Sequence, residues 1–458
     1  MELHDLTAVE QASGIRRREI SSIELLEHYL RRIDSLNEAV GAFAVIDEPG
    51  ARAQAAQADR AVSQADSLLP VLHGVTVPVK DLNLTAGVRT RFGTSVMDLV
   101  PDVDDDVVVR LREGGTVMTG KTTTPEFGFP CYTESDIGPY ARTPWDLARG
   151  AGGSSGGAAA AVSAGLAAVA QGSDGGGSVR IPASCCGLVG LKPSRGLISN
   201  GPLPDGPGGL VVQGALARTV ADAAALLGVM TGTDDGYLRA IAPEVPSLVV
   251  GCYSAPVIAD TVPDPQVLVA WRKVTQLLES LGHRVIEVEV PLALSDVPHF
   301  ERVWSAAAAG IPLTEQQVEG LRPLTRWLRE RGEALTEQEI AEAVTLMNRA
   351  ASAALRASQG VDVIVTPTLA QVPALVGALR DDDDPAGDFE AQKAFTPYTS
   401  PYNMTGQPAI TLPVHWTDDD LPVGVQLIGR PLQEAQLLSV AAQVEAALPW
   451  IQRHPEIW

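Results

Sequence analysis

Two glycine-rich clusters that each carry serine lie near the middle of the chain. The first runs from Gly152 to Gly157, and the second from Gly172 to Gly177, directly before Ser178. Glycines at this density let the backbone adopt positive φ and leave amide N–H groups uncovered, as a cradle for an anion or an oxyanion requires. A flexible loop is the plainer interpretation, but an Ala-rich helical stretch separates the clusters and apolar sequence follows them. The pattern therefore favours a site that stabilises negative charge.

Two other kinds of site share parts of this pattern. A phosphate cradle is disfavoured, because no Gly-Lys-Ser/Thr follows either cluster and no G-x-G-x-x-G opens a helix. Gly152-x-Ser154-x-Gly156 has the form of a nucleophile elbow, which would make Ser154 the nucleophile of an α/β-hydrolase-type esterase. That enzyme needs a histidine, and none of the seven histidines lies in an obvious loop motif. The elbow also leaves the second cluster unexplained, so it stays as the lesser alternative.

The whole arrangement resembles the amidase signature family. The family pattern of a lysine after a strand, then G-G-S-S-G-G, then G-[ST]-D-x-G-G-S-[IV]-R-x-P, corresponds here to Lys80, Gly152 to Gly157, and Gly172 to Pro182. The resemblance is densest from about 70 to 220 and thin from about 230 to 360, where such proteins differ in substrate contacts. Further similar segments lie outside the block: Phe127-Gly128, Thr143 to Asp146, Gly187 to Pro193, Asn403 to Ala409 and Pro422 to Gly429.

The resemblance implies a catalytic triad of two serines and a lysine. It makes Ser178 the nucleophile, Ser154 a bridging serine with an unusual cis peptide, and Lys80 the base. A serine hydroxyl is a weak nucleophile until a neighbour takes its proton, and burial can lower the pKa of a lysine enough for it to accept one. Ser154 would carry the proton between the other two residues.

The resemblance also implies an oxyanion hole made of backbone amides, in which residues without side chains allow close approach. These are the amides of Gly175, Gly176, Gly177 and Ser178. Three polar residues match positions that support the network in the family: Ser155, Asp174 and Arg180. A buried ion pair with no direct chemical role fits Asp174 and Arg180 at least as well.

Cysteines occur beside this region but form no metal or disulfide pattern. Cys131 and Tyr132 fall in a region that lines the acyl pocket in similar proteins, so they are the candidate pocket residues. Cys185 and Cys186 are expected to be small packing residues. No metal-ligand spacing and no cofactor motif is present, so the expected mechanism uses neither metal nor cofactor.

Alternating short apolar runs and amphipathic stretches must position these residues. A β-branched run from 75 to 81 predicts a buried strand with Lys80 at its end, and 116–119 predicts a second strand after a short helix from about 104 to 111. A capping box at Ser21 to Glu24 predicts a helix over about 22–35.

Helix and strand go on alternating toward the C-terminus. Strands are expected at 248–250, 285–288 and 361–365, with helices over 267–281 and from 336 to about 360. This alternation predicts an α/β fold, with a large mixed central β-sheet covered by helices on both faces. The acidic run Asp381 to Asp384 is expected to be a solvated loop.

No Pro/Ser-rich linker divides the chain, so a single domain over 1–458 is expected. It comprises an N-terminal helical segment (about 1–65), a signature core (about 70–220), a variable substrate-pocket region (about 230–360) and the C-terminal part of the core (about 361–458). Hydrophobic residues make up 45% of the chain and charged residues 20%, as in globular proteins.

The balance of charge limits the possible partners. Lys and Arg total 34 against 56 Asp and Glu, a formal net charge of −22. Such a surface repels phosphate backbones and anionic lipid, so neither nucleic acid nor a membrane is an expected partner. The few cysteines and the lack of a basic segment followed by an apolar one at the N-terminus favour a cytoplasmic location.

The expected activity is hydrolysis of a small carboxamide through a serine acyl-enzyme, giving a carboxylate and ammonia or an amine. An amidotransferase A-type subunit that needs partner chains is one alternative, although the run N-L-A-R-Y-D-G found in such subunits is absent. Acyl transfer to an amine or hydroxylamine uses the same intermediate, and a non-catalytic binding protein is a third option. The run Gly-Gly-Gly at 175 to 177, in place of a larger residue at the first position, resembles that of amidases acting on linear or cyclic amides and aryl acylamides. Dimers are common in similar enzymes, so a homodimer is a candidate assembly.

Overall fold

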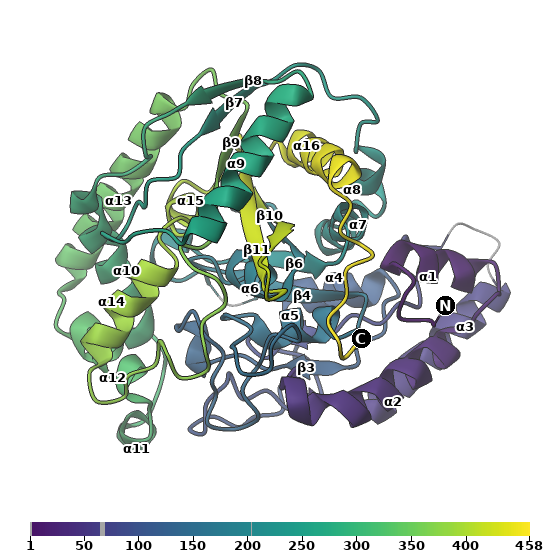
Figure 1. Ribbon diagram of the computed structural model, residues 1–458. Coiled ribbons are helices and arrows are strands. Elements are labelled where there is room, and N and C mark those ends of the chain that lie inside the picture. The colour runs from purple at the N-terminus through teal and green to yellow at the C-terminus, as the bar shows by residue number, and fades with distance from the viewer. Residues whose placement is uncertain (1, 65–68, 203) are drawn as a thin grey trace.

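The computed structural model describes residues 2–64, 69–202 and 204–458. A central sheet contains, from one edge to the other, β4 (Val169–Asp174), β6 (Val212–Ala217), β5 (Val189–Lys192), β10 (Ala409–Trp416), β11 (Pro422–Gly429), β9 (Val363–Pro367), β7 (Val249–Cys252) and β8 (Arg284–Glu287) (Figure 1). Neighbours from β4 to β9 pair antiparallel, whereas β9, β7 and β8 run parallel. The sheet is therefore mixed, as predicted.

Helices cover both faces of this sheet. One face carries α7 (Val220–Thr231), α9 (Pro265–Ser280) and α16 (Glu434–Ala447), and the other carries α5 (Gly156–Ser163), α6 (Arg180–Cys186), α13 (Glu337–Ala357) and α15 (Pro401–Met404). Along β9, Val363 and Val365 belong to the hydrophobic core under α7, α9 and α16, and Ile364 belongs to the core under α13 and α15. Side chains of a strand alternate between its faces, so a strand covered on both sides is apolar throughout. The predicted α/β fold class is confirmed.

The N-terminal part of the chain forms a separate group of helices, α1 (Ala8–Arg16), α2 (Ser22–Val40) and α3 (Glu48–Gln64), seen in purple in Figure 1. The predicted capping box is present, because the Ser21 side chain accepts from the Glu24 amide and the Glu24 side chain from the Ser21 amide. The helix continues beyond the predicted end to Val40, where Gly41 terminates it in the left-handed conformation with φ 64°.

A small second sheet holds the lysine strand. It consists of β1 (Phe43–Ile46), β3 (Gly120–Thr122) and β2 (Val79–Lys80), with β2 parallel to β3. The strand predicted over 116–119 begins later, at Gly120, and the predicted run itself holds only a parallel bridge between Val117 and Thr76. The predicted strand over 75–81 is reduced to its end. Regular pairing with β1 begins only at Gly120, whose φ is 154° and where an added Cβ would lie 2.1 Å from the Val45 carbonyl oxygen.

The other predicted elements occur close to their expected bounds: β7, α9, β8, α13 and β9. The short helix predicted from about 104 to 111 is α4 (Asp106–Glu113). Further α-helices are α8 (Gly236–Arg239), α10 (Val297–Ala309), α11 (Glu315–Glu319), α12 (Pro323–Glu333) and α14 (Pro385–Phe395). Asp381 to Asp384 are exposed, and Asp384 caps α14 by accepting from the Gly387 amide. Within the described ranges, no helix is both long and apolar enough to cross a bilayer.

Candidate active site

The three residues of the predicted triad come from three separate segments, the end of a strand and two turns. Lys80 ends β2, Ser154 lies two residues before α5, and Ser178 lies between β4 and α6. The two serine-bearing turns are joined by a hydrogen bond, in which the Ser155 amide donates to the Ser178 carbonyl at 3.1 Å. Buried strands and helices on both sides thus hold the glycine clusters next to each other.

Lys80 is fully buried beside Ser154. Its Nζ donates to Ser154 Oγ at 2.8 Å, to Ser173 Oγ at 3.1 Å and to the Ser173 carbonyl at 3.3 Å. Burial disfavours the ammonium form and lowers the pKa of Lys80 to about 7, although the negative charge of Asp174 opposes this shift. A large share of Lys80 is therefore neutral at physiological pH.

The two serines differ in their access to ligand. Ser154 is 2% exposed and follows a cis peptide bond from Gly153, in agreement with the predicted cis peptide. Its carbonyl accepts from Thr124 Oγ1 at 3.0 Å. Ser178 is 8% exposed and lines a pocket. Ser178 thus faces a pocket, whereas Ser154 is not among the residues that line it.

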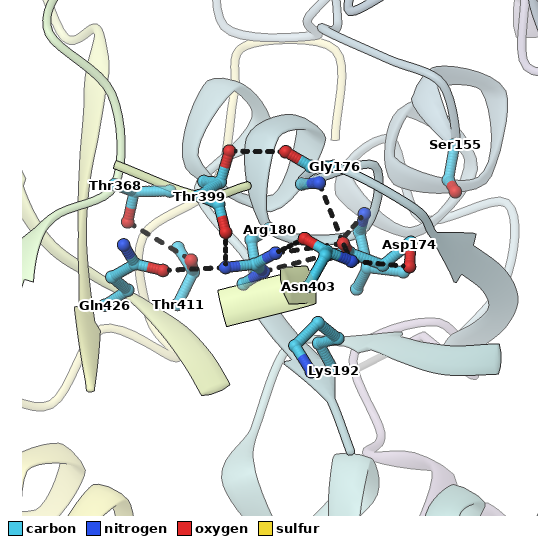
Figure 2. A network of polar contacts seen from close by, with 12 residues as sticks. Ser155, Asp174, Gly176, Arg180, Lys192, Thr368, Thr399, Asn403, Thr411 and Gln426 are labelled. Atoms are coloured by element: carbon cyan, nitrogen blue, oxygen red, sulfur yellow. Dashed lines mark hydrogen bonds and ion pairs between the residues drawn. The ribbon is translucent and has the colours of Figure 1, made fainter. Parts of the chain in front are cut away.

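Asp174 and Arg180 form a fully buried, two-pronged ion pair (Figure 2). Arg180 Nε donates to Asp174 Oδ2 and Nη2 to Oδ1, both at 2.9 Å. The remaining guanidinium N–H groups reach the Thr399 carbonyl, Gln426 Oε1 and Asn403 Oδ1. Burial alone would raise the pKa of Asp174, but the Arg180 charge and hydrogen bonds outweigh it and hold that pKa well below its usual range. The pair connects the turn before Ser178 to two segments from the C-terminal part of the chain, residues 399–403 and β11.

Asp174 also shapes the glycine turn before Ser178. Its Oδ1 accepts from the Gly177 amide at 2.8 Å. Of the four amides predicted for the oxyanion hole, that of Gly177 is therefore already used. The amides of Gly175, Gly176 and Ser178 have no protein acceptor within the described part of the chain.

Two further polar residues border this network. Ser155 bonds twice to β4, since its Oγ donates to the Ser173 carbonyl at 3.2 Å and accepts from the Ser173 amide at 3.3 Å. Lys192, which lies beside the ion pair in Figure 2, is fully buried and donates to the Pro193 carbonyl. Burial, together with the Arg180 charge, lowers the pKa of Lys192 to about 7. The sequence places Lys192 in a family-like segment but does not predict that its amine is buried.

A pocket opens beside Ser178. Gly176 and the predicted Cys131 also line it. Tyr132 is absent from the wall, because its ring is buried and its hydroxyl donates to Asp388 Oδ2 at 2.5 Å. The assignment of Tyr132 to the pocket is therefore corrected. Most of the wall is apolar, and its larger side chains are Phe129, Leu292, Phe300, Trp304, Phe389 and Met404.

Sequence reasoning missed the aromatic wall. Phe300 and Trp304 are one helical turn apart on α10, and their rings stack with centroids 5.5 Å apart. An added Cβ at Gly175 would lie 3.2 Å from the Trp304 ring, so a larger residue there would crowd this ring. The four-residue spacing of the two aromatics is visible in the sequence, but their direction toward Ser178 is not.

The elbow alternative finds no support in this geometry. None of the seven histidines, all within the described ranges, hydrogen bonds to Ser154 or Ser178. The group that bonds to Ser154 Oγ is Lys80. Among the residues described by the structure, no cluster of three or more His, Cys, Asp or Glu side chains could hold a metal ion.

Known proteins share both the sequence and this fold. The model of the amidase family matches residues 24–438. The 6-aminohexanoate-cyclic-dimer hydrolase of Paenarthrobacter ureafaciens is 36% identical over 487 aligned positions, covering 98% of this chain and 96% of that protein. A solved structure of 6-aminohexanoate cyclic dimer hydrolase matches with a TM-score of 0.88 at 32% identity, over 100% of this chain and 99% of the other. A crystal structure of an amidase gives 0.85 at 28% identity, over 97% and 100%. Together with the paired glycine–serine turns and the buried lysine between them, these matches show that the chain belongs to the amidase family.

Proposed function

We propose that this amidase cleaves the carbon–nitrogen bond of a small carboxamide through an acyl-enzyme on Ser178. The products are a carboxylate and ammonia or an amine. The observation that carries the proposal is the contact of 2.8 Å between Lys80 Nζ and Ser154 Oγ, made by a buried amine whose pKa is about 7. A neutral amine at this distance can accept the proton that an attacking serine must lose.

In the first half of the reaction, Ser178 Oγ attacks the amide carbonyl carbon. Its proton passes to Ser154 Oγ, whose own proton passes to Lys80 Nζ. When the tetrahedral intermediate collapses, the C–N bond breaks and the same residues return a proton to the leaving nitrogen. A water molecule then attacks the acyl carbon by the same proton path and releases the carboxylate. The connection between the Ser155 amide and the Ser178 carbonyl supports this path, because it holds the two serine turns together.

Backbone amides would stabilise the negative charge on the carbonyl oxygen. We assign this role to the amides of Gly175, Gly176 and Ser178, which are free of protein acceptors within the described ranges. The Gly177 amide instead holds Asp174, so its contribution is to the shape of the turn. Asp174 and Arg180 are then positioning residues that act through that turn.

The apolar wall of the pocket favours a substrate that carries an apolar group. Its aromatic rings give a favourable surface for an aryl, aliphatic or cyclic hydrocarbon portion. The similarity to a 6-aminohexanoate-cyclic-dimer hydrolase favours linear or cyclic amides of this kind. We therefore propose a small, largely apolar carboxamide as the substrate.

The test is to treat the wild type, Ser178→Ala and Ser154→Ala with a serine-reactive fluorophosphonate and to map the adduct by peptide mass spectrometry. Label on Ser178 that disappears in Ser178→Ala is the expected result. Label on Ser154 would instead support the esterase-type alternative. Absence of label on the folded wild type would contradict an accessible, activated Ser178.

A further inference from the structure

One ion pair interrupts the apolar wall of the pocket beside Ser178. Glu301 on α10 and Lys393 on α14 both line the pocket, and Lys393 Nζ lies 2.6 Å from Glu301 Oε1. The side chains are only 17% and 14% exposed. Aromatic rings flank the pair: Phe300 precedes Glu301 in the wall, and Lys393 Nζ lies 5.7 Å from the centroid of Phe389. An unpaired charge with so little exposure would interact strongly with a charged group that enters.

The pair is balanced by a second cation and a second anion outside the pocket. Lys393 Nζ also lies 2.6 Å from Glu390 Oε1, whose side chain is 67% exposed. Glu301 Oε2 lies 3.9 Å from Arg331 Nη2, whose side chain is 46% exposed. Two carboxylates and two cations thus face one another. The cluster as a whole offers neither excess positive nor excess negative charge to a ligand.

We propose that the Glu301–Lys393 pair makes this pocket select amides whose non-reacting part is uncharged. The inference rests on the proposed function in taking the pocket as the binding site of the amide. A ligand carboxylate or ammonium that enters loses its hydration and meets an already paired cluster, so nothing compensates for its burial. An uncharged aryl or alkyl group covers the aromatic wall without this cost.

The proposal predicts opposite changes when the two partners are removed. Glu301→Gln keeps the size of the side chain and leaves the cluster with one excess positive charge, which favours a ligand carboxylate. Lys393→Met keeps most of the aliphatic stem and leaves one excess negative charge, which favours a ligand ammonium. A wall that selects by size alone would not distinguish the two charged ligands in this way.

Binding can be measured without turnover in the Ser178→Ala background. The ligands are p-tolylacetamide and two analogues in which a carboxylate or an aminomethyl group replaces the ring methyl, titrated calorimetrically at pH 8. Ser178→Ala should bind the neutral amide at least about tenfold more tightly than either charged analogue. Adding Glu301→Gln should improve the Kd of the carboxylate by on the order of tenfold, and adding Lys393→Met should do so for the ammonium.

Glu390→Gln is the matched control. Like Glu301→Gln, it removes a carboxylate that pairs with Lys393. Glu390 is exposed and lies outside the pocket, so the order of the three ligand affinities should not change. Equal binding of all three ligands, no binding of the neutral amide, or an equal effect of Glu390→Gln and Glu301→Gln would overturn the proposal. If Lys393→Met does not fold, the nearly isosteric Glu301→Gln decides the outcome. Failure of the proposed function would appear separately, as a lack of fluorophosphonate label on Ser178.

Discussion

The burial of Lys80 determines the pH range in which the proposed base can work. Its pKa is lowered to about 7, so the amine is protonated and unable to accept a proton at lower pH. We predict that kcat/KM rises with pH through about 7 and levels off above it, measured with a neutral amide over pH 5 to 9. Lys80→Met should abolish the activity.

Lys192 provides the control for this profile, because its pKa is also about 7. Lys192→Met should leave the rising limb at the same pH, since Lys192 Nζ bonds to the Pro193 carbonyl and to neither serine. If the rising limb moves in Lys192→Met but not in conservative changes around Lys80, the group that titrates is Lys192 and not Lys80.

The pH dependence of stability gives a second readout of the Lys80 pKa. Between pH 7 and the ordinary value of 10.5 the unfolded chain holds a proton that folded Lys80 lacks, so the Lys80 contribution to stability increases with pH in that window.

Ser154 tests the proton path at the level of one hydroxyl group. Since Ser154 Oγ is the atom that bonds to Lys80 Nζ, removing it interrupts transfer without changing the nucleophile. We predict that Ser154→Ala lowers kcat by about 10²- to 10⁴-fold, with a much smaller effect on KM. Steady-state kinetics on a neutral amide, with thermal melts to verify folding, provide the measurement. An unchanged kcat in the folded variant would exclude Ser154 from the path.

At this scale the sequence predicts which of the proposed catalytic residues meet better than it predicts the wall of the pocket. The spacing of the two serine clusters and the position of Lys80 are local patterns, and the structure brings these three residues to one site. Residues of α10 and α14 form much of the pocket wall. These helices are far apart in the chain, so the sequence does not show that they lie at one pocket. Tyr132 was misplaced for the same reason, because its partner Asp388 lies 256 residues away.

Among the elements, β4 supports the lysine strand through one buried glutamine. Gln171 Oε1 accepts from the Lys80 amide at 2.9 Å, and its Nε2 donates to Asn83 Oδ1 at 3.0 Å and Gln213 Oε1 at 2.7 Å. Gln171→Leu would leave these buried groups unpaired. We predict a loss of about 1–3 kcal/mol in the free energy of unfolding and a lower kcat, because the lysine strand loses its anchor. Urea titrations and kinetics measure the two effects.

Gln443→Leu serves as the comparison for Gln171→Leu. Gln443 is half-buried on α16 and bonds to His283, away from the serine turns. Its replacement should leave kcat unchanged. Equal kinetic effects of the two variants would show that Gln171 has no special role in positioning Lys80.

The elements themselves were predictable where local signals agree. The capping box at Ser21 and the apolar run of β9 each carry enough local information to identify a helix and a strand. The two short strands around Lys80 do not. Their bounds depend on where β1 approaches Gly120, which is a contact between segments far apart in the chain. Long-range pairing of this kind leaves no local periodicity to detect.

Over the whole molecule, the Asp174–Arg180 pair joins parts of the chain that are more than two hundred residues apart. From α6, Arg180 reaches the Thr399 carbonyl, Asn403 and Gln426 on β11, at separations of 219, 223 and 246 residues. The turn that carries Ser178 is thereby fixed to the C-terminal part of the chain, including β11 of the central sheet. This connection makes the stability of the whole fold depend on the residues that shape the site.

Removing one member of this pair leaves the other charge buried without a partner. We predict that Arg180→Met lowers the free energy of unfolding by about 3–5 kcal/mol and abolishes activity, and that adding Asp174→Asn restores part of the stability but not the activity. Urea denaturation of the single and double variants measures the coupling. The exposed pair of Arg17 and Glu19 is the control, and Arg17→Ala should leave the denaturation midpoint unchanged. If Arg180→Met and the double variant were equally stable, the unpaired Asp174 charge would not be the cause of the loss, and the pair would contribute only its packing volume.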